Sequence, residues 1–140
     1  MKKMRASLAE NSGLNPIMTK NLSLALHAVI LWALCGATIG LGRALVGIET
    51  TLIIHALAAP VLAVLISFHY FRRYPEASAL ATAVVFLAVV AALDAGLVAP
   101  VFEKSYAMFR SILGTWLPFG LIFLSTLLTG LVSKKRRVQN

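Results

Sequence analysis

Three histidines and one aspartate stand inside long apolar runs, and these residue types could do chemistry. They are His27, His55, His69 and Asp94. An ionisable group is costly in hydrocarbon, so within a membrane it usually pairs with another polar group, faces water, or lines a path for a ligand or proton. These four residues therefore mark where a functional site should be sought.

His55 and Asp94 are expected at the same depth near one end of their apolar runs, so their side chains could pair. Three more charged residues, Arg43, Glu49 and Glu103, lie close to that end. Salt bridges between helices would close this end of a bundle, and we favour that structural interpretation. The alternative is a ligand or proton site that opens to water. These five residues form the candidate site.

His27 and His69 are expected at similar depth near the opposite end, on consecutive antiparallel helices. Two such imidazoles could hold the iron of a b-type haem from opposite faces. Residues 70–73 are aromatic and basic, however, which favours an interfacial position for His69. A four-helix haem protein would show a second matched pair, and His55 has no histidine partner at its own depth, so we expect no haem cofactor. Two histidines without a nearby carboxylate also argue against a metal site.

The elements that must position these residues are four apolar runs. They lie at 22–42, 51–71, 77–98 and 112–132. At about 1.5 Å per residue, runs of this length cover the roughly 30 Å hydrocarbon core of a bilayer. Pro60 and Pro118 should kink the second and fourth helices, and Pro100 should end the third. The predicted fold is an all-α integral membrane four-helix bundle with kinked second and fourth helices.

The segments outside these runs predict the topology. Residues 1–20 are expected to form a flexible cytoplasmic tail, 21–133 the four-span domain, and 134–140 a basic cytoplasmic tail. Ten of the thirteen lysines and arginines lie on the side of the two termini. Because these residues resist translocation, we expect a multi-pass protein of the bacterial inner (plasma) membrane with both termini cytoplasmic.

Two shorter patterns predict local structure. Phe102, Tyr106 and Phe109 recur at the spacing of one helix face, which predicts a short amphipathic helix in the membrane interface. Gly36 and Gly40 form a small-residue motif in the first span. We favour close packing of that motif inside the monomer, and a homodimer through the Gly36/Gly40 face is the alternative.

Composition excludes several classes of protein. A hydrophobic content of 59% and a mean hydropathy of +0.86 lie outside the soluble range. The basic residues flank the apolar runs, so the net charge of +8 indicates contact with the lipid bilayer and not with nucleic acid. Cys35 is the only cysteine, which excludes an intramolecular disulfide. We find no motif of hydrolytic, phosphate-binding or metalloprotease chemistry and expect no enzyme.

The stretch from Leu93 to Tyr106, LDAGLVAPVFEKSY, is the most distinctive part of the sequence. The whole chain resembles the small four-helix bacterial inner-membrane proteins of unknown function, a resemblance that implies no activity. It departs from small multidrug exporters, which depend on an acidic residue in the middle of the first span. Three functions stay open: an accessory or structural membrane protein, which we favour; a carrier or proton-coupled binding protein with an outward-facing polar cavity and unknown ligand; and a haem redox subunit.

Overall fold

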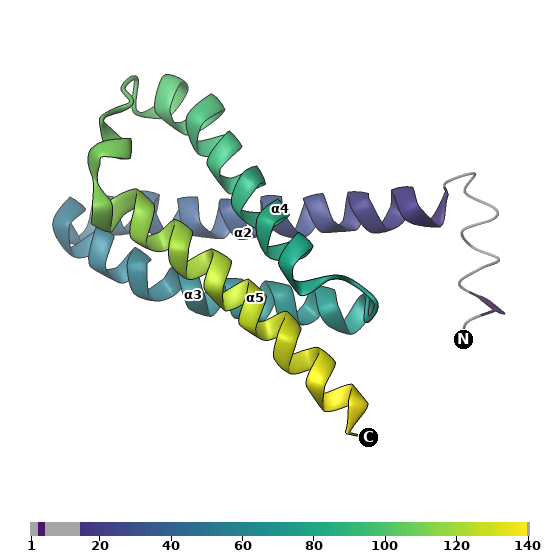
Figure 1. Cartoon of the computed structure of the whole chain (residues 1–140). Helices are drawn as coiled ribbons and strands as arrows, with labels where there is room; N and C mark the ends of the chain where they lie inside the picture. The colour runs from purple at the N-terminus through teal and green to yellow at the C-terminus, as the bar shows by residue number, and fades with distance from the viewer. Residues whose placement is uncertain (1–2, 5–14, 140) are drawn as a thin grey trace.

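The computed structural model describes residues 3–4 and 15–139, and this part of the chain contains helices and no strand. Four long α-helices carry the fold (Figure 1): α2 (Pro16–Val46), α3 (Ile48–Arg73), α4 (Ala79–Leu93) and α5 (Leu117–Val138). Three short segments join α4 to α5: the π-helix η1 (Asp94–Phe102), the 3₁₀-helix η2 (Ala107–Arg110) and the π-helix η3 (Ile112–Trp116).

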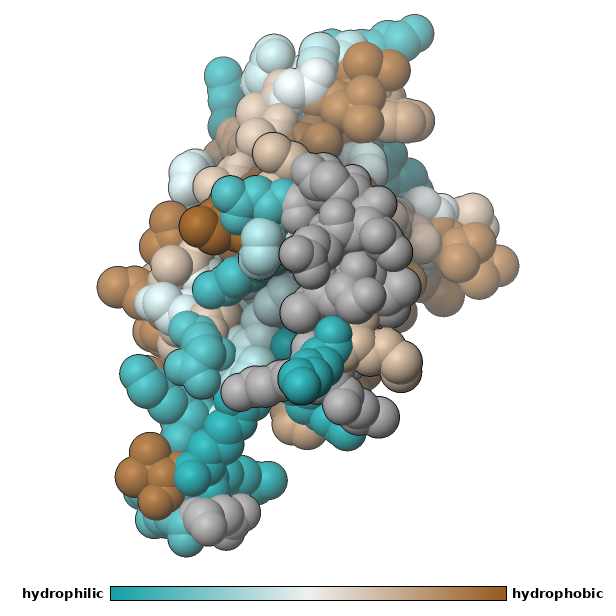
Figure 2. All heavy atoms as spheres, turned by 90° about the vertical axis from the view of Figure 1, so that its right-hand side faces the viewer, coloured by the Kyte–Doolittle hydropathy of each residue, from teal (hydrophilic) through white to brown (hydrophobic). Residues whose placement is uncertain are grey.

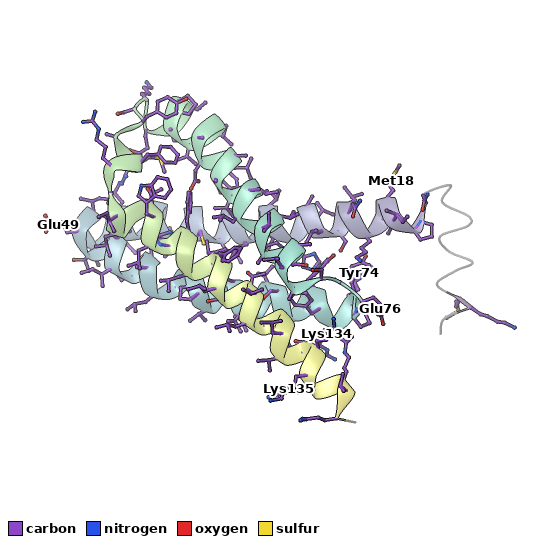
Figure 3. The ribbon with its side chains drawn as sticks, in the orientation of Figure 1. Met18, Glu49, Tyr74, Glu76, Lys134 and Lys135 are labelled. Atoms are coloured by element: carbon purple, nitrogen blue, oxygen red, sulfur yellow. The ribbon has the colours of Figure 1, made fainter. Side chains whose placement is uncertain are left out.

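The described helices indicate a multi-pass membrane protein. Because η1 continues α4 and η3 leads into α5, four helical stretches are long and apolar enough to cross a bilayer. Large apolar side chains cover their outer faces, for example Leu41, Leu45 and Leu57. Figure 3 shows polar residues at the two ends, with Glu49 at one and Tyr74, Glu76, Lys134 and Lys135 at the other. The predicted all-α fold with four long apolar helices is confirmed.

Each long helix packs against two others. α2 contacts α3 and α4, and α5 contacts the same two helices, so the order around the bundle is α2, α3, α5, α4. The core between them includes Leu31 of α2, Phe86 of α4 and Ile122 of α5, together with Ala59 and Ala63 of α3. Alanines at these two positions let the backbone of α3 approach its neighbours closely.

Helix α2 begins earlier than the apolar run predicts. Asn15 caps it by accepting a hydrogen bond from the backbone N–H of Ile17 at 3.1 Å, and Pro16 occupies its first turn. Both residue types favour a helix start, because asparagine pairs a free N–H and proline needs none. Residues 16–20 of the expected tail are therefore helical. Most of that tail, residues 1–2 and 5–14, lies outside the described residues.

The connection from α2 to α3 is a single residue, Gly47, shorter than the gap between the predicted apolar runs 22–42 and 51–71. Gly47 has a φ of 79°, which glycine adopts without steric cost. Nearby, a Cβ added to Gly42 would lie 2.6 Å from Cγ2 of the buried Thr51. The absence of a side chain at Gly42 thus allows the two helices to meet just before the turn.

The expectation that Pro100 ends the third span is wrong, because the helical stretch passes through Pro100 as η1 and continues to Phe102. The backbone N–H of Glu103 donates to the carbonyl oxygen of Val98 at 2.9 Å, a bond five residues apart. Such a widened turn accommodates a proline that has no N–H to donate. Pro118 likewise lies where η3 passes into α5, whereas α3 remains helical through Pro60.

Two further boundaries differ from the prediction. The expected amphipathic helix through Phe102, Tyr106 and Phe109 is wrong, since only Ala107–Arg110 forms a short 3₁₀ turn. Its aromatic side chains nevertheless meet, with the rings of Tyr106 and Phe109 stacked 6.3 Å apart. At the other end, α5 continues to Val138, so most of the expected basic tail is helical. Basic side chains there interact favourably with the carbonyl end of the helix.

Candidate functional site

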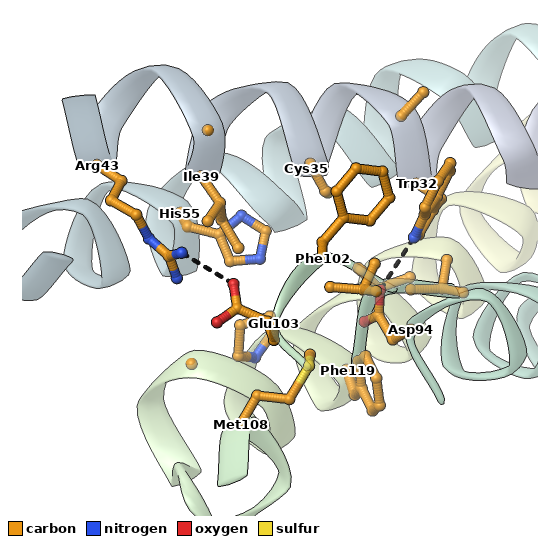
Figure 4. Close-up of a pocket in the computed structure, with 18 residues that line it drawn as sticks. Trp32, Cys35, Ile39, Arg43, His55, Asp94, Phe102, Glu103, Met108 and Phe119 are labelled. Atoms are coloured by element: carbon orange, nitrogen blue, oxygen red, sulfur yellow. Dashed lines mark hydrogen bonds and ion pairs between the residues drawn. The ribbon is translucent and has the colours of Figure 1, made fainter. Parts of the chain in front are cut away.

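A cavity of about 560 Å³ lies at the end of the bundle that carries Gly47 and the segment after η1 (Figure 4). Helix α2 forms one wall, η1 and the segment after it another, and the first turns of α5 a third. The residues of α2 in this wall recur every three or four positions, so one helix face lines the cavity. They include Trp32, Cys35, Gly36, Ile39, Gly40 and Arg43.

Gly36 and Gly40 help to keep the cavity open. A Cβ added to either glycine would meet no atom within 4 Å, which shows that no neighbouring helix packs closely against them. The expectation that this motif packs α2 inside the monomer is therefore wrong, whereas Gly42 of the same helix does have a close neighbour, Thr51. The alternative, a homodimer through the same face, stays a prediction.

Arg43 and Glu103 form an ion pair at one edge of the cavity. Nη1 of Arg43 lies 2.9 Å from Oε1 of Glu103, and the two side chains are 48% and 31% exposed. The pair ties the end of α2 to the residue after η1. Glu49 was expected at the same surface, but it lies at the start of α3 (Figure 3) and does not line the cavity. Of the five candidates, the other four line it.

Asp94 is held by Trp32, a residue that the sequence analysis missed. The indole N–H of Trp32 donates to Oδ1 of Asp94 at 2.9 Å, across the gap between α2 and η1. Trp32 stands in the middle of an apolar run, away from the interface where tryptophan is common, and a buried indole N–H needs an acceptor. The position of Trp32 in the sequence could therefore have identified it as the hydrogen-bond partner of a polar group inside the bundle. Among the described residues, no ion pair joins Asp94 to His55, the partner expected for it.

His55 lines the same cavity from α3 and is buried, with 5% of its surface exposed. Its Nδ1 has no hydrogen-bond partner in the part of the chain that the structure describes. A buried polar group without a partner costs about 1–3 kcal/mol, so its presence calls for an explanation. A hydrogen bond from a bound molecule would supply one.

The remainder of the wall is largely apolar and aromatic. Phe102 lies between the Arg43–Glu103 pair and the Trp32–Asp94 pair in Figure 4, and Phe119 flanks Asp94. Apolar walls with a few placed polar groups are typical of small-molecule sites. The arrangement can hold an apolar body among the rings and a polar group at the edge.

The histidines at the other end of the bundle do not fit a haem. The rings of His27 and His69 are neighbours, as their matched depth predicted, but they stack on each other with centroids 5.5 Å apart and planes 24° apart. Axial ligation requires each ring to point a nitrogen at an iron held between them. Nδ1 of His27 donates to the carbonyl oxygen of Ser23 at 2.7 Å, which fixes the orientation of the ring in this stack. In the structure this pair is a ring stack between α2 and the end of α3.

The chain was compared with protein families, curated proteins and solved structures. No protein-family model matches the chain, and neither a curated protein nor a solved structure matches it.

Proposed function

We propose that this is a small membrane-embedded binding protein or carrier, which takes up one small amphipathic molecule in the cavity between α2 and η1. One observation carries the proposal: His55, 5% exposed and without a partner for Nδ1 among the described residues, stands in the wall of a cavity of about 560 Å³. That size is within the range of small-molecule sites.

The lining supports an amphipathic ligand. An apolar body would lie against Trp32, Phe102 and Phe119, and a group that hydrogen bonds would reach His55. The Arg43–Glu103 pair offers both charges at the edge, with Glu103 partly accessible. Since a protonatable imidazole and a carboxylate share this cavity, binding coupled to a proton is consistent with the proposal.

The second candidate is an accessory or structural role. The contacts of Arg43 with Glu103 and of Trp32 with Asp94 favour it, because both pairs join α2 to the η1 segment and satisfy three charged groups without a ligand. The two candidates differ at His55. In the described part of the chain, Tyr70 and Thr126 also have an unpartnered buried oxygen and do not line the cavity, so the missing partner alone does not separate the candidates. The position of the His55 imidazole in the cavity wall is what favours a ligand site.

Replacing His55 separates the two candidates. Small molecules retained by the purified protein would be measured by native mass spectrometry, with His69→Phe as the control because His69 lies at the other end. We expect roughly one molecule bound per wild-type or His69→Phe chain and about a tenfold loss in His55→Phe, since one lost hydrogen bond is worth about 1–1.5 kcal/mol.

The opposite result would favour the structural role. It would be a wild-type protein that retains nothing, together with a His55→Phe variant that unfolds at a higher temperature. Removing an unsatisfied polar group from an interior that stays empty stabilises the fold.

We also propose a topology in the bacterial inner (plasma) membrane with both termini cytoplasmic and with α3 and α5 kinked at their prolines. The ten-to-three division of basic residues supports it. In this orientation the cavity opens outward. Reporter fusions after Arg73 and at the C-terminus should behave as cytoplasmic, and a fusion after Lys104 as external. A C-terminal reporter active outside the cell would contradict this topology.

A further inference from the structure

A second hollow, which we call the basic groove, runs between α3 and α5 at the end opposite the cavity. Its volume is about 590 Å³, and three arginines line it: Arg72 of α3 and Arg136 and Arg137 of α5. Figure 2 views the molecule from this end and shows hydrophilic residues gathered toward the end of α5, with hydrophobic residues around the sides. The groove thus lies where the apolar middle gives way to a charged end.

The lining of the basic groove changes from apolar to positive in the same direction on both helices. Residues four apart lie on one face of a helix, and on each helix two apolar residues precede an arginine at that spacing. The series are Val64, Phe68 and Arg72 on α3, and Leu128, Val132 and Arg136 on α5. A lipid has the same order, with an acyl chain at depth and a charged head at the interface.

The polar side chains that line the basic groove are arginines, which only donate hydrogen bonds, and serines or threonines, whose hydroxyls donate or accept them. A second series on α5 consists of Ser125, Thr129, Ser133 and Arg137. Among the residues that the structure describes, no acidic residue lines the groove and no carboxylate pairs with its arginines. Arg137 donates to the carbonyl oxygen of Phe71 at 2.8 Å, which fixes its position at the end of α3. Positive charges that converge without a counter-ion favour an anion between them.

We propose that the basic groove binds one anionic phospholipid of the surrounding bilayer. Its phosphate lies among Arg72, Arg136 and Arg137, and an acyl chain lies along the apolar series of α3 and α5. Guanidinium groups bind phosphate oxygens in a two-pronged geometry, and basic pockets between membrane helices take anionic head groups. The proposal does not depend on the ligand of the other cavity.

General attraction to an anionic membrane does not explain the clustering. Arg73 is the last residue of α3, and Lys134 and Lys135 lie at the same end (Figure 3), yet none of the three lines the groove. They therefore provide a matched control. Arg72→Gln/Arg136→Gln and Arg73→Gln/Lys135→Gln each remove two positive charges from the same two helix ends, but only the first pair removes charge from the groove, where Arg137 remains.

The test uses the full chain, delipidated in a neutral detergent. Phosphatidylglycerol or phosphatidylcholine is then added, and bound lipid is counted by native mass spectrometry while the unfolding temperature is followed. We expect one tightly bound phosphatidylglycerol on the wild type and a higher unfolding temperature than with phosphatidylcholine. Affinity should fall about 10- to 30-fold in Arg72→Gln/Arg136→Gln and less than about twofold in the control, because each lost basic contact weakens binding several-fold.

Three outcomes would overturn the proposal. Equal losses in both double variants would mean that diffuse charge attracts the lipid, and equal affinity for both lipids would mean that the groove does not recognise an anion. Protection by inorganic phosphate equal to that by phosphatidylglycerol would identify a free anion as the ligand.

Discussion

Gly130→Ala should destabilise the folded protein by about 1–3 kcal/mol, the usual cost of adding an atom to a tightly packed interior. The new Cβ would lie 2.5 Å from Cβ of Ala79, 2.7 Å from Cζ of Phe71 and 2.9 Å from Cα of Ala79. The last of these atoms belongs to the backbone at the start of α4, so relief requires α4 to move away from α5. Thermal unfolding of the purified protein in detergent measures the effect.

Gly120→Ala is the control on the same helix. A Cβ at Gly120 meets nothing within 4 Å, so this variant should be as stable as the wild type or more stable by up to about 1 kcal/mol, because alanine favours helix over glycine. Equal unfolding temperatures for the two variants would mean that α4 does not pack on α5 at Gly130.

Gly36→Leu should abolish retention of the small molecule while leaving the protein folded. The position meets no atom within 4 Å of an added Cβ, yet it lines the cavity, so a leucine side chain would extend into the space that the ligand needs. We expect at least a tenfold fall in the bound molecule, corresponding to about 1.4 kcal/mol, and an unfolding temperature close to that of the wild type. Native mass spectrometry measures both the ligand and the oligomeric state.

Gly120→Leu serves as the comparison, since it adds the same bulk at an open position outside the cavity. If Gly36→Leu instead converted a dimer to a monomer and left retention unchanged, the Gly36/Gly40 face would be a homodimer interface. The cavity would then not be the ligand site.

The number, order and approximate positions of the helices could be predicted because apolar runs of span length allow few other structures in a bilayer. Their ends could not be placed from hydropathy, since Asn15 and Gly47 act through a side-chain cap and a positive φ. The continuation through Pro100 was missed for a related reason. A proline predicts a break, but only the following hydrogen bonds decide whether a π turn absorbs it.

The sequence predicted how deep in the membrane each candidate side chain lies, but not which neighbour it faces. Position along a span gives the height of a side chain, so His55 and Asp94 were expected at one end and do line one cavity. The height of a residue does not give the rotation of its helix about its own axis. That rotation depends on packing, and it directs Asp94 to Trp32, away from His55, the partner expected for it. Arg43 meets Glu103 in a salt bridge of the kind that the sequence predicted for this end.

The one-residue turn at Gly47 limits how the cavity between α2 and η1 can change shape. Only two Cα steps of about 3.8 Å separate the last residue of α2 from the first of α3, so these helix ends stay within about 8 Å of each other. The α2 and α3 residues that line the cavity are therefore held together at this end of the bundle. A change in the cavity's width is therefore left to the walls formed by η1 and by the first turns of α5, and the Arg43–Glu103 ion pair restrains the first of these.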